Sequence, residues 1–318
     1  MKILVTGAAG FIGSHLCERL LEDPTYQVFG VDTFIGPTPP SFKRGNIQDL
    51  KKLPRFSFID SNLLKTDIDQ LLSNIDAIYH LSAIPGVRES WGKEFAPYMY
   101  HNILVTQKLL EAAKDKKIDR FIYISTSSVY GEKHGKVSEN AITLPLSPYG
   151  ITKLAGEHLC RVYEKSFNLP LVILRYFTVY GPRQRPDMAF HRFMKQLLTD
   201  QPISVFGDGL QTRDFTFIDD CVTATKAVLT AENVIGETIN IGGKERSSIL
   251  DVISILEEIT NKKALLSFTG NVKGDPKHTW ADITKAEKLL HYSPATSLKK
   301  GLEKEWQFIQ KLYEENQS

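Results

Sequence analysis

The sequence is poor in cysteine and has no long apolar run. Its three cysteines are an odd number without Cys-x-x-Cys spacing. We therefore expect no disulfide framework and interpret them as buried thiols in a reducing compartment. The apolar stretch at residues 3–5 is too short for a signal peptide, and no later stretch is long enough to span a membrane. We expect a cytoplasmic protein without a membrane partner.

The sequence also lacks an excess of charge of either sign. The 39 Lys and Arg residues nearly balance the 37 Asp and Glu residues, which leaves a formal net charge of +2. We therefore expect no nucleic-acid partner, and any anionic ligand must be held by locally placed side chains. The eight histidines show no paired ligand spacing, and no Gly-x-Ser-x-Gly turn is present. Neither a metal site nor a serine hydrolase is predicted.

Short apolar runs alternate with segments of helical periodicity through the first part of the chain. This order predicts an α/β fold of the Rossmann type, a doubly wound parallel sheet with helices on both faces. After about residue 180, prolines and glycines separate shorter elements, which predicts a smaller lobe at 179–318 beside a first domain at 1–178, with later elements able to return to it. The predicted strands are residues 2–6, 26–32, 55–59, 77–81, 120–125 and 171–176, and the predicted helices are 11–21, 64–72, 95–114 and 148–167.

A glycine-rich turn joins the first predicted strand to the first predicted helix. In it, Gly7 permits a tight turn, Gly10 lets the backbone approach a pyrophosphate, and Gly13 lets the helix pack closely on the strand. Asp32 ends the next strand at the position suited to a ribose diol, and its charge disfavours the 2′-phosphate of NADP. We predict that this turn, Gly7, Gly10, Phe11, Ile12 and Gly13, binds NAD. The alternative is a purely structural glycine turn.

A tyrosine and a lysine lie one turn apart on the helix that begins at Pro148. Ser147 is a favourable N-cap and Pro148 a favourable first residue, so Tyr149 and Lys153 share one face. A nearby ammonium lowers the pKa of a phenol, which brings Tyr149 closer to acting as a base. We interpret the pair as catalytic. The alternative is a surface aromatic beside a cation.

These motifs together resemble the extended short-chain dehydrogenase/reductases. The resemblance implies that Lys153 also holds the nicotinamide ribose and that Thr126, in the run that ends in Val129-Tyr130-Gly131, is the catalytic hydroxyl. Dehydratases of this superfamily carry Asp-Glu after that position, whereas this chain has Ser127 and Ser128, so elimination of water is not expected. Further cofactor contacts implied by the resemblance are Asn62 and Leu63 at the adenine, and Leu81, Ala83 and Asn102 at the nicotinamide ribose. For Leu81 and Ala83, core packing remains the alternative.

Two segments resemble the UDP-glucuronate 4-epimerases: residues 85–90 and 178–189, Thr-Val-Tyr-Gly-Pro followed by Arg-Pro-Asp-Met-Ala. This likeness extends over nearly the whole chain. It implies NAD-dependent, reversible C4 epimerisation of UDP-glucuronate to UDP-galacturonate through a 4-keto intermediate, without decarboxylation. A sugar carboxylate requires charge-assisted hydrogen bonds, for which the planar fork of Arg185 is suited, assisted by Thr178, Ser127 and Ser128.

The resemblance assigns the remaining ligand contacts to the second half of the chain. Phe206 is expected to cover the uracil, Arg213 to meet the diphosphate and Asp275 to accept from the uridine ribose. Arg88 is expected to approach the sugar or the diphosphate. Some relatives carry an arginine where this chain has Val272, which leaves more of the diphosphate contact to Arg213.

Three other functions remain open from the sequence. A UDP-glucose or UDP-N-acetylglucosamine 4-epimerase would use the same catalytic residues and needs no arginine at C6. A UDP-glucuronate decarboxylase is disfavoured by Ser128, and a non-catalytic NAD-binding protein by the intact Tyr149, Lys153 and Thr126. The helices at 95–114 and 148–167 carry extra apolar residues, which relatives pair across a two-fold axis, so we expect a homodimer. The alternative is that these faces are ordinary core.

Overall fold

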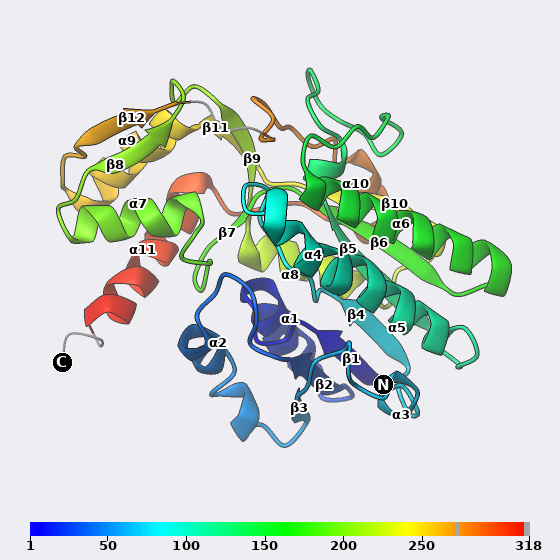
Figure 1. The fold of residues 1–318 in the computed structure, drawn as a ribbon. Helices are drawn as coiled ribbons and strands as arrows, with labels where there is room; N and C mark the ends of the chain where they lie inside the picture. The colour runs from blue at the N-terminus through cyan, green and yellow to red at the C-terminus, as the bar shows by residue number, and fades with distance from the viewer. Residues whose placement is uncertain (271–273, 315–318) are drawn as a thin grey trace.

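A parallel sheet forms the centre of the molecule (Figure 1). The computed structural model describes residues 1–270 and 274–314, and within these ranges seven strands pair in the order β10-β6-β5-β4-β1-β2-β3. The Rossmann-type fold predicted from the sequence is confirmed. The strands are β1 (Lys2–Thr6), β2 (Gln27–Asp32), β3 (Phe56–Asp60), β4 (Ala77–His80), β5 (Arg120–Thr126), β6 (Leu171–Tyr176) and β10 (Thr238–Ile241).

The sheet is covered on both faces, which explains why its central strands are apolar at successive positions. In β1, the side chains of Ile3 and Val5 enter one hydrophobic cluster, and Leu4 enters the other. Helices α1 (Phe11–Leu21) and α8 (Ile218–Ala227) pack together on the first face. On the other face lie α3 (Ile68–Leu71), α5 (Val105–Ala113) and α6 (Pro148–Phe167).

Two predicted helices differ in the structure. The helix expected at 64–72 is wrong except for the single turn of α3, because Asn62 and Thr66 hold the preceding residues in a hydrogen-bonded turn. The helix expected at 95–114 is interrupted, since α4 (Phe95–Tyr98) and α5 are joined by a π-helical segment at Met99–Leu104. The wider π turn contains the buried Asn102, whose amide bonds a neighbouring loop. The helix α2 (Pro40–Asn46) was not predicted.

The second half of the chain forms two small sheets beyond the carboxyl ends of the main strands (Figure 1). One joins β7 (Val179–Tyr180), β9 (Thr212–Phe217) and β11 (Glu245–Ser248), and the other pairs β8 (Ile203–Phe206) with β12 (Leu266–Thr269). Because β10 enters the main sheet and α8 packs on α1, this half is not separate in space from the first; a division of roles at residue 178 stays a prediction. The other helices are α7 (Ala189–Leu198), α9 (Ile249–Thr260), α10 (Thr284–Leu290) and α11 (Leu298–Glu314). Among the described residues, no helix has the length and apolarity needed to cross a membrane.

Candidate active site

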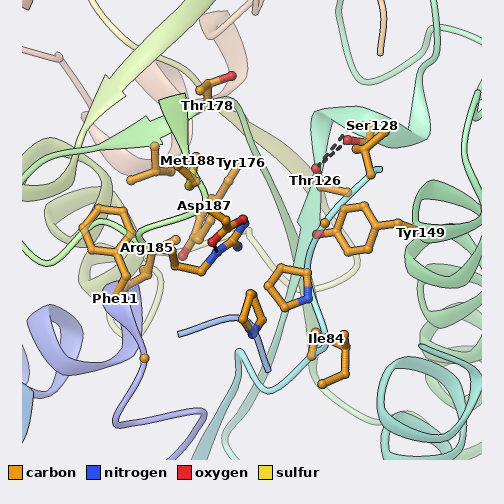
Figure 2. A pocket seen from close by; sticks show the side chains of 18 of the residues that line it. Phe11, Ile84, Thr126, Ser128, Tyr149, Tyr176, Thr178, Arg185, Asp187 and Met188 are labelled. Atoms are coloured by element: carbon orange, nitrogen blue, oxygen red, sulfur yellow. Dashed lines mark hydrogen bonds and ion pairs between the residues drawn. The ribbon is translucent and has the colours of Figure 1, made fainter. Parts of the chain in front are cut away.

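A cavity of about 810 Å³ opens where the main sheet meets the smaller sheets. Ligands of doubly wound folds bind at this edge, beyond the carboxyl ends of the strands. Every predicted site residue except Asn102 lines this cavity. Residues from the ends of six strands, and from both halves of the chain, therefore meet there. Figure 2 shows its inner part, with Arg185 and Asp187 on one side and Tyr149, Thr126 and Ser128 on the other.

The glycine turn forms one end of the cavity. Gly7 has φ +73° and donates its N–H to Val31 at 2.8 Å. A Cβ on Gly13 would lie 2.1 Å from the oxygen of Gly7, so the close approach of helix and strand requires glycine there. The first turn of α1 carries no acidic residue, and Phe11 and Ile12 line the cavity. The free N–H groups and helix dipole at this end fit the pyrophosphate of NAD.

Asp32 at the end of β2 is paired with a lysine that the sequence analysis missed. Its carboxylate accepts from the N–H of Ala9 at 3.2 Å and of Phe34 at 2.8 Å, and Lys43 Nζ lies 3.1 Å from Oδ1. Lys43 belongs to α2, and its side chain also lines the cavity. The negative charge expected to repel a 2′-phosphate is therefore partly neutralised. No spacing rule could identify Lys43, because α2 itself was not predicted.

Asn102 supports the cavity wall from behind. Its Oδ1 accepts from the N–H of Ile84 at 2.7 Å, and its Nδ2 donates to the oxygen of Ile84 at 3.0 Å and to Thr152 Oγ1 at 3.0 Å. Asn102 thus supports the loop after β4 and does not line the cavity, and a contact with the cofactor stays a prediction. Leu81 and Ala83, at the start of that loop, do line the cavity.

Asn62 and Leu63, expected at the adenine, line the cavity beside the end of β3. The Oδ1 of Asn62 accepts from the N–H of Leu64 at 2.9 Å, which fixes the turn after β3. Leu63 is nearly fully buried, so this wall is rigid.

The start of α6 places Tyr149 in the cavity. Ser147 Oγ accepts from the N–H of Gly150 at 3.1 Å, which caps the helix as predicted. Burial raises the pKa of Tyr149, while the charge of Arg185 and a hydrogen bond with Thr126 lower it. Burial is the largest of these effects, so the pKa of Tyr149 lies above its usual value. A lowering of this pKa by Lys153 stays a prediction; the Lys153 ammonium lies 4.2 Å from the centroid of the Tyr123 ring.

Lys153 is buried above an ion-paired network. Burial lowers its pKa to about 8, and the nearby Glu157 opposes this shift. Glu157 accepts from Arg175 through Nε at 2.9 Å and Nη2 at 2.6 Å, and from the Ser125 hydroxyl. The two charged side chains are 5% and 7% exposed, so this buried pair supports the turn of α6 that carries Lys153.

Hydroxyl groups surround the reaction end of the cavity. Thr126 ends β5, and its Oγ1 accepts from the N–H of Ser128 at 3.2 Å and bonds the Ser128 hydroxyl at 3.2 Å. Ser127 completes this turn, and all three residues line the cavity. Glu132 also lines the cavity, but its carboxylate accepts from the backbone N–H of Lys277 at 2.6 Å. The turn after β5 therefore offers hydroxyls where an elimination reaction needs a carboxylate.

A loop after β7 brings Arg185 to the opposite side. Its Nε and Nη2 lie 3.0 and 2.9 Å from the two carboxylate oxygens of Asp187. Thr178, just before β7, lines the same cavity. A guanidinium in this position offers charge-assisted hydrogen bonds to an anionic group of a ligand whose hydroxyl faces Tyr149.

The outer end of the cavity is bordered by arginines and an aromatic ring. The guanidinium of Arg88 lies 4.0 Å from the centroid of the Phe206 ring, and its Nη2 lies 3.2 Å from Asp275 Oδ2. Arg213 donates to the backbone oxygens of Thr212 and Lys277, and burial lowers its pKa.

Arg192 is a further arginine of this end that the sequence analysis missed. It projects from α7 to 5.4 Å from the Phe206 ring centroid and lines the cavity. The amphipathic pattern of α7 was the available sequence signal for this helix and its polar face.

Val272, which the sequence analysis named, lies outside the described residues.

The described ranges 1–270 and 274–314 contain no group of three or more His, Cys, Asp or Glu side chains placed to hold a metal ion.

Comparison with known proteins gives a consistent family. Residues 3–242 match the model of the NAD dependent epimerase/dehydratase family. A UDP-glucuronate 4-epimerase of Thermodesulfobacterium geofontis is 40% identical over 95% of this chain and 94% of its own length. A Bacillus subtilis protein named as an uncharacterized UDP-glucose epimerase, YtcB, is 60% identical over 99% of both chains.

Solved structures agree with this result. The crystal structure of UDP-glucuronic acid 4-epimerase from Bacillus cereus, in complex with UDP-glucuronic acid and NAD, is 64% identical to this chain. It superimposes with a TM-score of 0.98 and covers 98% of this chain and 100% of its own. The chain therefore belongs to the NAD dependent epimerase/dehydratase family.

Proposed function

We propose that the protein is an NAD-dependent epimerase that interconverts UDP-glucuronate and UDP-galacturonate at C4. One observation carries this proposal: the Arg185 guanidinium faces, across one cavity, the Tyr149 and Thr126 hydroxyls (Figure 2). A hexuronate ring presents a hydroxyl and a carboxylate on neighbouring ring positions, so one ring can meet both groups. A neutral sugar gives the guanidinium no anionic partner.

The chain supplies the proton transfer and the positioning. Bound NAD supplies the acceptor and donor of the C4 hydride. Tyr149 takes the proton of the C4 hydroxyl through its contact with Thr126, and Lys153 would hold the cofactor ribose. After the keto sugar has turned its other face, Tyr149 returns the proton. Because the cofactor is restored in each cycle, it is expected to stay bound to the purified protein.

The keto intermediate requires protection from loss of carbon dioxide. A 4-keto hexuronate is a β-keto acid, and its carboxylate leaves when the bond from C5 stands perpendicular to the carbonyl plane. Arg185, Thr178 and the two serines hold the carboxylate near that plane. Removal of this hold by Arg185→Ala is expected to weaken substrate binding and to release decarboxylated products; unchanged kinetics with a clean product spectrum contradicts this role.

A neutral-sugar epimerase is the second candidate, because the Bacillus subtilis relative carries the name of a UDP-glucose epimerase. One experiment separates the candidates. The purified protein is incubated separately with UDP-glucuronate, UDP-glucose and UDP-N-acetylglucosamine, and products are identified by NMR. UDP-galacturonate supports the proposal, turnover of neutral sugars alone refutes it, a UDP-pentose indicates a decarboxylase, and no turnover despite bound NAD indicates a binding protein.

We also propose that the protein is a cytoplasmic homodimer. The surface of the π segment and α6 exposes large apolar side chains, which a second copy would cover. Those exposed by 42 to 56% are Met99, Tyr100, Leu104, Ile151, Val162 and Phe167. Ile151→Glu is expected to shift the sedimentation coefficient to that of a monomer, whereas a wild-type chain that sediments as a monomer refutes the dimer.

A further inference from the structure

Asp187 is a charged residue of the cavity to which the reaction scheme above gives no task. It lies in the turn closed by the N–H of Met188 and the oxygen of Arg185 at 3.0 Å. Both carboxylate oxygens accept from Arg185, and the two side chains are 30% and 20% exposed. Burial opposes ionisation, but the bonds and charge of Arg185 lower the pKa of Asp187, so the carboxylate is ionised at neutral pH. A negative charge thus lies inside a cavity built for anions.

The loop that carries this pair is fixed from outside. Arg183, two residues before Arg185, has a left-handed φ of +67° and donates to Glu18 at 2.7 Å and to Ser14 at 3.2 Å. Ser14 and Glu18 belong to α1, whose first turn borders the cofactor end. Asp187 therefore holds Arg185 from a backbone that is itself anchored, which is what a positioning contact requires.

The contact decides which edge of the guanidinium is free. Arginine presents a planar fork with a side edge, Nε and Nη2, and an end edge, Nη1 and Nη2. Asp187 occupies the side edge, and Nη1 has no hydrogen bond within residues 1–270 and 274–314. Since the fork is planar, a carboxylate bound to the end edge lies near the plane of the guanidinium.

We propose that Asp187 is a positioning residue that turns the Arg185 guanidinium so that only its Nη1–Nη2 edge meets the sugar carboxylate. This inference rests on the proposed function. Asp187 fixes the direction along which the carboxylate, and with it the C5–carboxylate bond, is held. Its charge also weakens ground-state binding, since the guanidinium is already partly neutralised. The site therefore binds the substrate less tightly but holds its carboxylate in a fixed orientation.

Orientation matters because it controls a side reaction. When the C5–carboxylate bond of the 4-keto intermediate stands perpendicular to the carbonyl plane, it breaks, and its electron pair forms an enolate with the C4 carbonyl. Carbon dioxide leaves, and C5 takes a proton to give a UDP-4-keto-pentose. If this product departs, the hydride is not returned, so reduced nicotinamide accumulates on the protein. Decarboxylation therefore leaves both a product and an absorbance signal.

The test uses Asp187→Asn, which keeps the size of the side chain and removes its charge. With UDP-glucuronate we expect a fall in KM of roughly three- to tenfold, because the guanidinium loses its competing anion. We also expect about a tenfold rise in the fraction of turnovers that end in UDP-4-keto-pentose and reduced nicotinamide. Asp69→Asn is the matched control, because its ion pair with Lys116 is on the surface, with Asp69 76% exposed.

Three results would overturn the inference. A rise in KM with an unchanged product ratio makes Asp187 a general binding or structural contact. A fall in KM with an unchanged product ratio shows that the charge of Asp187 affects binding but does not orient the Arg185 guanidinium. Unchanged kinetics shows that Asp187 has no role. Asp187→Glu, which keeps the charge and displaces it, is expected to decarboxylate without the fall in KM, and it serves if Asp187→Asn does not fold. A wild-type protein that fails to convert UDP-glucuronate refutes the proposed function instead.

Discussion

Replacement of Glu157 by glutamine tests whether the buried network beneath Lys153 stabilises both fold and site. The carboxylate of Glu157 accepts from Arg175 at 2.9 and 2.6 Å, and neither side chain is more than 7% exposed. In Glu157→Gln the guanidinium keeps one acceptor but loses its counter-charge. Removal of one partner of such a pair costs about 3–5 kcal/mol, and the retained acceptor places the expected loss near 3 kcal/mol.

The change should also reach the active site. Glu157 raises the pKa of Lys153, and burial already lowers that pKa to about 8. Without the carboxylate, the pKa of Lys153 falls further. Because the ammonium is the form that holds the cofactor ribose, the alkaline limit of activity is expected to move to lower pH.

Urea unfolding followed by circular dichroism measures the stability, and a pH–rate profile measures the site. Asp49→Asn is the control, because Asp49 pairs with Lys52 on the surface, where both side chains are more than two thirds exposed; no change in midpoint is expected there. In the double variant Glu157→Gln with Arg175→Met, the unpaired charge is gone, so the loss should be smaller than the sum of the single losses. A single-variant loss below about 1 kcal/mol would refute the reasoning.

Three further predictions concern the cofactor and the catalytic pair. Tyr149→Phe should lower turnover by roughly 10²- to 10⁴-fold while the protein retains NAD, measured by product assay and by nucleotide released on denaturation; loss of the nucleotide would instead assign Tyr149 to cofactor binding. Since the pKa of Lys153 is about 8 in the folded chain and near 10.5 unfolded, folding releases a proton between these values. Stability should therefore rise by about 3 kcal/mol from pH 8 to pH 10.5 relative to Lys153→Met, measured by urea unfolding at each pH; parallel curves contradict the shift. In Asp32→Ser, Lys43 lacks its partner at 3.1 Å, so the protein should retain NADP more strongly than wild type, as measured by mass spectrometry of released nucleotide; an unchanged preference for NAD would show that Lys43 does not face the 2′ position.

Much of the fold could be predicted because its signals are local. The strand of β1 and the helix α1 begin and end where expected, since an apolar run, a glycine turn and an amphipathic segment follow one another directly. Ser147 and Pro148 likewise fixed the start of α6. The predicted helix at 95–114 failed at Met99–Leu104 because a π segment is selected by a tertiary contact, the bonding of Asn102 to Ile84.

The site was predicted as a set of residues but not as a set of pairs. Motif spacing identified Asp32 and Asp275, yet their counter-ions, Lys43 and Arg88, come from segments that spacing does not relate to them. Lys43 lies on an unpredicted helix. The approach of the Arg185 charge to Tyr149, which opposes the rise of the tyrosine pKa on burial, could not be foreseen either, because it depends on how a loop after β7 folds over the end of β5.

The ion pairs at the cavity show locally the same balance of charge that the whole sequence has. An unpaired charge in a partly buried cavity is costly, and a strongly positive cavity would bind any nucleotide anion. Here Asp32, Asp187 and Asp275 each neutralise one of the cations that border the cavity. These ion pairs weaken the attraction of the cavity for anions in general. Selection among anionic ligands then depends on the direction in which the remaining hydrogen-bond donors point. The proposed intermediate loses carbon dioxide when its C5–carboxylate bond stands perpendicular to the carbonyl plane. For such a substrate, donors fixed in direction serve the reaction better than a stronger field.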